Sequence, residues 1–531
     1  MPLRPLLLCT LVFAAAAAET IDTDICIYGA SAAGVMAAVQ AAREGRPVVL
    51  LEPGRHAGGI SVEGLGGTDI NNHDFKNDVA VGGLAAEFYR RIGKAYGKET
   101  PVYRFEPHVA EGVVEALLAE QAVQPRFNER IVLGPVGVEK AGDPPRLTAI
   151  HLESGLTVRA KVFIDATLEG DLMAGAGVDT VIGREANALY GETKNGIRAV
   201  NTYRQFEVKV DPFRVPGDPT SGLIPTVQDE PLGTPGGADH HVQGYCFRLC
   251  FTREPANRVA FTQPEGYDPR QYEIYLRYLK AGGKLFSPGA NLPHGKTDLG
   301  SWHDLSLNLY GMNDAYPGGD HATRARVLRE HRVFSQGLCY FLANDPAVPE
   351  GVRATWSAWG TCRDEFNDNQ GWPRMFYVRD ARRMVNDQVI TEHHTRRTNQ
   401  TRVEDPVAVA YWPPDTHHVR RIVKDGACYN EGFVFGGDDW APFGISYRAI
   451  VPRERECANL LVPSCPSSSH VAYGAIRLEW TFMALGQAAA SAAVIAARDG
   501  VSVQRVPYAA LRERLVADRQ VVALTGERSA P

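Results

Sequence analysis

The sequence has few cysteines, and none of them form a redox or zinc motif. Its nine cysteines are scattered over 531 residues, without a Cys-x-x-Cys pair and without a Cys/His grouping at zinc spacing. A dithiol–disulfide half-reaction and a structural zinc site both require such groupings. We therefore expect no metal. Cys246 with Cys250, and Cys457 with Cys465, are close enough to pair, but buried free thiols are favoured.

A surplus of positive charge is also missing. Lys and Arg number 56 against 62 Asp and Glu, which gives a net charge of −6 with both signs interspersed. Nucleic-acid binding and polybasic membrane anchoring both depend on clustered positive charge. The composition therefore predicts no nucleic-acid partner.

Long apolar runs are confined to the N-terminus. Residues 1–18 contain one positive charge, Arg4, then an apolar run and five alanines that end at Ala18. This pattern is typical of a secretory signal peptide cleaved near Ala18, and it predicts a periplasmic or extracellular protein. Since no other uninterrupted run of roughly 18 apolar residues follows, we expect no stable membrane insertion.

A strand–turn–helix–strand pattern occupies residues 24–52. The apolar run 24–28 meets Gly-Ala-Ser-Ala-Ala-Gly at 29–34, an Ala-rich helical stretch follows, and a second apolar run ends on Glu52. In a dinucleotide-binding unit the first glycine makes a tight turn, the helix start binds the pyrophosphate, and an acidic residue roughly 20 positions on binds the ribose. Ser31 replaces the middle glycine. The predicted contacts are Gly29, Ser31, Ala32, Ala33, Gly34 and Glu52.

A glycine pair at 58–59 closes the run Glu-Pro-Gly-Arg-His-Ala-Gly-Gly. An acidic residue, an arginine and a Gly-Gly pair in this order resemble FAD-dependent oxidoreductases of the glutathione-reductase-like type. The resemblance implies FAD rather than NAD; the alternative is an α/β domain without a nucleotide. The further contacts expected for FAD are Pro53, Arg55, Gly58, Gly59, Ile131, Ala166, Thr167 and Gly486.

The resemblance implies an α/β fold whose Rossmann-like FAD-binding domain has three layers, a parallel sheet and a β-meander. Strands are expected at 130–139, 147–152, 156–160, 161–167 and 459–463, and an Ala-rich helix at 480–498 would aim its N-terminus at the flavin. Residues 195–440 lack the βαβ rhythm, with helices near 268–281 and 322–342. The predicted division is a signal peptide 1–18, an FAD domain 19–194 and 441–500, an inserted α+β substrate domain 195–440, and a tail 501–531.

Several other stretches are similar to a secreted bacterial subgroup of FAD-dependent oxidoreductases, some of them labelled xanthan lyases. The similar stretches are residues 163–178, 183–187, 245–250, 363–366, 377–384, 459–463 and 469–473. The similarity implies an exported oxidoreductase, and the label makes a polysaccharide lyase the alternative.

No second Gly-x-Gly-x-x-Gly follows a strand, so we expect no built-in NAD(P)H domain. The reaction that remains is a direct hydride exchange between FAD and a polar small-molecule or saccharide-like substrate. Its electrons would go to an external acceptor or come from an external donor. Besides the lyase, two alternatives stay open. One is a flavoprotein reductase fed by an external donor, and the other is a binding protein without turnover.

Removing a hydride from a carbon requires a base near the flavin, and histidine suits this role. His470 is the first candidate, because it lies between the returning strand and the last long helix; it could equally order that loop. Arg477 and Glu479 could contact flavin and substrate or form a structural ion pair. Arg448 and His417 are further catalytic candidates, and exposed loop residues would look the same.

Overall fold

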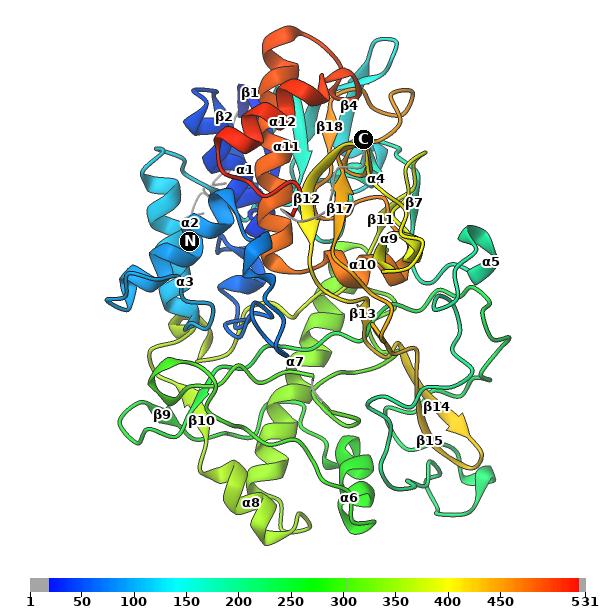
Figure 1. Ribbon diagram of the computed structural model, residues 1–531. Coiled ribbons are helices and arrows are strands. Elements are labelled where there is room, and N and C mark those ends of the chain that lie inside the picture. Colours follow the sequence, from blue (N-terminus) through cyan, green and yellow to red (C-terminus); the bar gives the residue numbers. More distant parts are fainter. Residues whose placement is uncertain (1–18, 302, 525–531) are drawn as a thin grey trace, which may run out of the picture.

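The computed structural model describes residues 19–301 and 303–524, so the predicted signal peptide 1–18 lies outside the described residues. Segments from both ends of the chain, coloured blue to cyan and orange to red, share the upper part of the molecule in Figure 1. The green middle of the chain forms the lower part. Residues far apart in sequence therefore build the upper part together.

A seven-stranded sheet forms the centre of the upper part, in the order β3-β2-β1-β6-β5-β4, with β18 paired to β6. Its strands are β1 (Thr20–Tyr28), β2 (Val48–Glu52), β3 (Arg126–Phe127), β4 (Val138–Ala141), β5 (Arg146–His151), β6 (Thr157–Asp165) and β18 (Leu460–Leu461). β1, β2, β3, β6 and β18 are parallel, whereas β5 pairs antiparallel with both of its neighbours, β6 and β4. This parallel α/β core fits a Rossmann-like FAD domain.

One edge of β6 is shared by two partners. β5 pairs with its first residues, at Thr157 to Arg159, and β18 pairs with Phe163 and Ile164 near its end. The strands expected at 156–160 and 161–167 are therefore one continuous strand, because no turn residue separates them. The strand expected at 130–139 is shortened to β4, since Gly134 and Pro135 begin a 3₁₀ turn at Pro135–Gly137.

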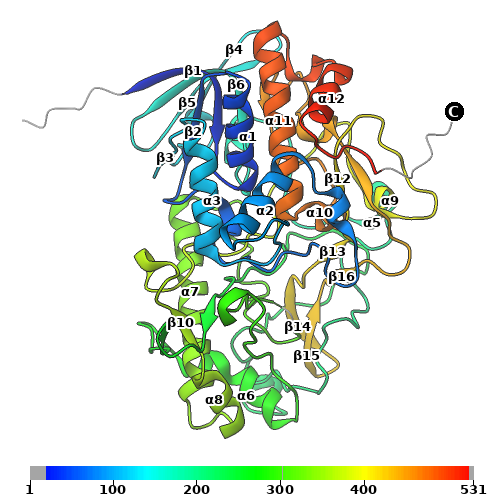
Figure 2. The same ribbon diagram turned by 60° about the vertical axis from the view of Figure 1, so that its left-hand side comes forward.

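Two Ala-rich helices, α1 (Ala32–Arg43) and α11 (Glu479–Asp499), pack directly against each other beside the sheet (Figures 1 and 2). A Cβ atom on Gly486 of α11 would lie 2.0 Å from the carbonyl oxygen of Ala33. Only glycine permits so close an approach of two backbones. α11 is also long and apolar enough to cross a membrane, but 94% of its most apolar window is buried inside the protein.

We predict that Gly486→Ala destabilises the protein by about 1–3 kcal/mol, because the added methyl group has no space against α1. Gly112→Ala is the matched control. Gly112 lies in α3 (Pro107–Ala119), is exposed and has no atom within 4 Å of its would-be Cβ, so alanine there stabilises the helix by up to about 1 kcal/mol. Denaturant unfolding measures both. Equal shifts in the two variants would contradict the close helix crossing.

The other helices of the described chain are distributed over the upper and lower parts of the molecule (Figure 1). They are α2 (Gly83–Ala95), α4 (Asp171–Gly175), α5 (Asn187–Tyr190), α6 (Glu273–Lys280), α7 (His321–Asn344), α8 (Glu350–Ser357), α9 (Glu392–Thr395), α10 (His470–Ile476) and α12 (Tyr508–Ala517). The helices expected near 268–281 and 322–342 are confirmed as α6, preceded by a 3₁₀ turn, and α7. Figure 2 shows α7 running from the sheet toward α8 at the lower end.

Outside the sheet the strands are short and form small pairs or a three-stranded sheet. They are β7 (Thr180–Val181), β8 (Phe251–Thr252), β9 (Arg258–Val259), β10 (Gly360–Cys362), β11 (Arg383–Met384), β12 (Pro406–Ala410), β13 (Asp415–Thr416), β14 (Arg420–Lys424), β15 (Ala427–Glu431), β16 (Val434–Phe435) and β17 (Phe443–Ser446). β12 pairs with β17. The two strands of this pair therefore lie on opposite sides of the predicted domain boundary at residue 440. The division into domains stays a prediction.

All eight cysteines of the described chain are buried free thiols. This confirms the interpretation favoured by the sequence over the Cys246–Cys250 and Cys457–Cys465 pairings. Burial raises the pKa of several of these thiols, among them Cys26 and Cys339, so they remain protonated and unreactive at neutral pH.

Candidate active site

A cavity of about 490 Å³, here called the cofactor cavity, lies where β1, β2 and β6 end. Ligands of open parallel sheets bind at the carboxyl ends of the strands. Seven of the residues predicted to bind the cofactor line this cavity: Gly29, Ser31, Glu52, Pro53, Arg55, Gly59 and Thr167.

The turn between β1 and α1 has the geometry that a phosphate group requires. Gly29 has a φ of +95°, and a Cβ there would lie 2.7 Å from the backbone nitrogen of Thr167. The Ser31 hydroxyl donates to the carbonyl of Ala166 at 2.6 Å and accepts from the Gly34 amide at 3.4 Å. Ser31 therefore ties the turn to β6. Apart from the Gly34 amide, which Ser31 caps, the amides of the first turn of α1 have no intrahelical acceptor and can bind an anion.

Glu52 is held at the end of β2 by two backbone amides. Its carboxylate accepts from Ala30 and from Gly54, each at 2.7 Å. Burial raises the pKa of Glu52 to about 7, against the opposing effect of these hydrogen bonds. A bound ribose hydroxyl would add a donor to the same carboxylate and favour its ionised form.

Seven other predicted cofactor residues do not appear in the wall of this cavity: Ala32, Ala33, Gly34, Gly58, Ile131, Ala166 and Gly486. Several of these residues instead make hydrogen bonds or packing contacts that stabilise the segments around the cavity. The Gly58 amide donates to the Ala30 carbonyl at 2.7 Å, and the Ile131 amide donates to the Tyr28 hydroxyl at 2.9 Å. Gly486 contacts Ala33. Gly486 thus serves helix packing in this structure, and its expected contact with the cofactor stays a prediction.

A second cavity of about 280 Å³, here called the arginine cavity, is lined by side chains from distant parts of the chain. Its arginines are Arg104, Arg204, Arg248, Arg379 and Arg477, and its aromatic residues are Tyr89, Tyr203, Tyr377, Trp412, Phe433, Phe435 and Trp480. Asp69, Asp298, Asp415, Glu479 and His417 also belong to its wall. Of the predicted catalytic residues, the structure brings His417 and Arg477 together here.

His417 is uncharged in this cavity. Burial, together with the positive charges of Arg379 and Arg477, lowers the pKa of His417 well below its usual value. A neutral imidazole can accept a proton, but the arginines oppose the positive charge that results.

Arg477 pairs with a different carboxylate from the one expected. It donates to the Asp415 carbonyl at 2.9 Å and to the Tyr377 hydroxyl at 2.9 Å, and its guanidinium lies 3.6 Å from the Asp415 carboxylate. Within the described residues it forms no ion pair with Glu479. The structural ion pair considered from the sequence is therefore wrong, because the tertiary fold brings Asp415 beside Arg477.

Glu479 is the residue that connects the two cavities, since it belongs to the wall of both. It is the first residue of α11 and is buried, and burial raises its pKa to about 8. Among the described residues, three buried polar atoms in this turn have no hydrogen-bond partner: Glu479 Oε1, Trp480 Nε1 and Thr481 Oγ1. Unsatisfied polar atoms at a helix N-terminus fit the polar edge of a bound flavin.

His470 and Arg448 are not among the residues that line either cavity, and their catalytic roles stay predictions. His470 is the buried first residue of α10, and its Nδ1 lies 2.9 Å from a carboxylate oxygen of Asp380. Arg448 is largely exposed and pairs with Asp405 at 3.0 Å. Sequence places both residues near the returning strand, but it does not fix the direction in which α10 and the turn before it face.

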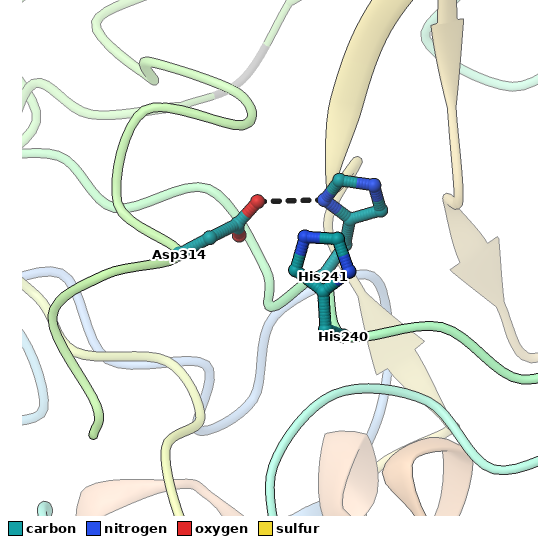
Figure 3. Close-up of side chains that lie close together, drawn as sticks. All are labelled: His240, His241 and Asp314. Carbon is teal, nitrogen blue, oxygen red and sulfur yellow. Dashed lines mark hydrogen bonds and ion pairs between the residues drawn. The ribbon is translucent and has the colours of Figure 1, made fainter. Parts of the chain in front are cut away.

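A separate cluster of potential metal ligands lies in the middle of the chain (Figure 3). His240, His241 and Asp314 bring one ligand atom each within 4.8 Å of one another. His241 Nδ1 hydrogen-bonds to the Asp314 carboxylate at 2.6 Å. Burial lowers the pKa of His241, but Asp314 outweighs this effect and raises it. The arrangement therefore functions as a histidine–carboxylate ion pair.

The parallel sheet, the glycine turn and the cofactor cavity define a dinucleotide-binding α/β protein. The chain belongs to the FAD dependent oxidoreductase family, because the sequence model of that family matches residues 24–515. It is an FAD-dependent oxidoreductase with FAD as its cofactor, and the turn, Glu52 and the first turn of α11 fit this group. No curated protein matches the chain.

Similar solved structures share only part of the fold. They include the L-amino acid deaminase from Proteus vulgaris (14% identity, 32% of this chain and 54% of that chain, TM-score 0.22). The myxobacterial chondrochloren halogenase CndH has 14% identity over 31% of this chain and 41% of that chain (TM-score 0.23). OTEMO, in complex with FAD and NADP, has 17% identity over 27% and 25% of the two chains (TM-score 0.20). Matches this partial carry no conclusion about substrate.

Proposed function

We propose that the protein exchanges a hydride directly between FAD and a polar small-molecule or saccharide-like substrate bound in the arginine cavity. The supporting observation is the position of Glu479, which lies in the walls of both cavities. A group at the end of the cofactor cavity and a ligand in the arginine cavity would thus meet at one carboxyl group. Bound FAD supplies the two-electron chemistry.

The chain's own residues would then orient the substrate and handle its proton. Arg477, fixed by Asp415 and Tyr377, is positioned to bind a polar group of the substrate. Glu479 holds a proton at neutral pH and can exchange it with a substrate oxygen or nitrogen. The buried side chains of Trp480 and Tyr377 line the same cavity and would limit the access of water to a bound substrate.

Anaerobic mixing of the yellow protein with sugars, alcohols, amines and acids tests the proposal. We expect loss of the flavin absorbance with at least one class. The reductase alternative is tested in reverse: chemically reduced protein would recover its absorbance with a compound that has an activated double bond. If neither change occurs and an unsaturated product forms from an acidic polysaccharide, the lyase alternative replaces the proposal.

Export to the periplasm or beyond belongs to the same proposal, with electrons passed to an acceptor or taken from a donor outside the chain. Its support is the sequence of residues 1–18. The N-terminal sequence of protein purified from the natural host tests it. We expect the mature chain to begin near Glu19; a chain that retains its first residues would contradict export by this route.

A further inference from the structure

The arginine cavity contains a buried arginine, Arg379, that forms no ion pair among the described residues. Arg379 is 1% exposed. Its guanidinium donates to the Gly244 carbonyl at 3.0 Å, to the Ser301 hydroxyl at 2.5 Å and to Cys246 Sγ at 3.4 Å, and none of these partners is a carboxylate. Its Nε is buried without a hydrogen-bond partner. Burying an unpaired charge costs free energy, so this position favours a ligand that brings a negative charge.

The two other buried arginines of the cavity, Arg248 and Arg477, already have carboxylate partners. Arg248 forms an ion pair with Asp298 at 2.7 Å, and Arg477 lies 3.6 Å from the Asp415 carboxylate. Glu479, whose pKa burial raises to about 8, adds no charge at pH 7. Asp69, a further carboxylate of the wall, has its pKa raised by burial to about 6, so it is charged at pH 7, and its charge acts on Arg248 and Arg477. Among the deeply buried arginines of the cavity, Arg379 is the one that forms no ion pair within the described residues. A single arginine without a carboxylate partner matches a monoanion better than a dianion.

The remaining wall suits a flat or ring-shaped body. The Arg379 guanidinium lies over the Tyr377 ring, 4.7 Å from its centroid. Further rings come from Trp412, Phe433 and Trp480. Aromatic side chains contact planar and ring-shaped ligands over large areas and at low entropic cost.

We infer that the arginine cavity binds a monocarboxylate, with the carboxylate at Arg379 and a ring-shaped body against the aromatic side chains. That this ligand is also the substrate rests on the proposed function. Charge-assisted hydrogen bonds from a guanidinium to a carboxylate are among the strongest in proteins. The guanidinium of Arg379, a residue of the cavity wall, supplies such a donor.

Isothermal titration of the FAD-loaded protein with matched probes tests this inference. Sodium benzoate is compared with benzamide, and sodium glucuronate with glucose, so that each pair differs in the anionic group. We expect at least one carboxylate to bind at least about tenfold more tightly than its neutral counterpart. The inference is overturned if neither pair shows this preference, or if phenyl phosphate binds more tightly than benzoate.

Variants locate the anion. Arg379→Met is expected to weaken binding of the preferred carboxylate by about 10- to 100-fold, the effect of losing a charged hydrogen-bond donor. Arg448→Met, which removes an arginine outside both cavities, should leave this affinity unchanged. FAD content and circular dichroism check folding. A folded Arg379→Met variant with parental affinity would overturn the assignment, and the probe comparison in the parent protein decides if the variant does not fold.

The outcomes separate this inference from the proposed function. Carboxylate-selective binding without any change in flavin absorbance would support the binding site and count against hydride exchange. Bleaching by neutral alcohols or amines alone, with no preference for carboxylates, would support hydride exchange and overturn the monocarboxylate inference.

Discussion

Glu479→Gln is expected to keep the fold and the bound FAD while slowing flavin reduction by substrate by about 100- to 10,000-fold, the usual contribution of a positioned acid or base. Glu479 lies in the walls of both cavities, and its Oε1 has no partner among the described residues. Glutamine has nearly the same shape but cannot exchange the proton. Anaerobic stopped-flow measurement of the flavin absorbance gives the rate.

The pH dependence of the same rate identifies the group. Since burial raises the pKa of Glu479 to about 8, oxidation of a substrate should accelerate as pH rises through 8 and the carboxylate forms. The variant should lose this dependence. Stability gives a second measurement. The unfolded state releases the proton near pH 4.5, so the contribution of Glu479 to folding is present below 4.5 and is lost as pH rises through about 8.

His470→Gln is the paired variant, because sequence alone favoured His470 as the base. Its imidazole lies beside Asp380 and in neither cavity. We expect flavin reduction within about threefold of the parent rate, with lower thermal stability. If instead His470→Gln is slow and Glu479→Gln is fast, the base is His470 and the assignment of Glu479 is wrong. If both are fast, His417 in the arginine cavity is the next candidate.

Gly29→Ala is expected to produce a folded protein that has largely lost FAD. The new Cβ would lie 2.7 Å from the Thr167 amide nitrogen, in a backbone conformation with φ +95°. Backbone strain and crowding of this kind cost about 1–3 kcal/mol each. Relief of both moves the turn away from the position that binds phosphate, which weakens FAD binding by about 100-fold or more. Titration of the apoprotein with FAD measures the loss.

Gly45→Ala separates strain from crowding. Gly45 also has a positive φ, of +74°, but no atom lies within 4 Å of its would-be Cβ. This variant should lose some stability and retain its affinity for FAD. Parental FAD affinity in Gly29→Ala would show that the turn after β1 is not the phosphate-binding turn.

The nucleotide-binding unit was predictable from the amino-acid sequence, because the features that specify it are local. The turn at 29–34, its flanking strands and Glu52 lie within one short segment. The strands and the helix in this segment follow from the periodicity of its apolar residues. The turn follows from the ability of glycine to adopt a positive φ. The buried thiols and the long helices α7 and α11 were predictable for the same reason.

The arginine cavity could not be predicted, because its residues meet only through long-range packing. Arg248, Arg379 and Arg477 come from distant segments of the chain. No pattern in the sequence predicts that these three arginines line one cavity. The partner of Arg477 and the burial of Glu479 likewise depend on which loops pack above α11. Local pattern therefore fixed the cofactor, while charge compensation between distant segments fixed which arginine remains unpaired.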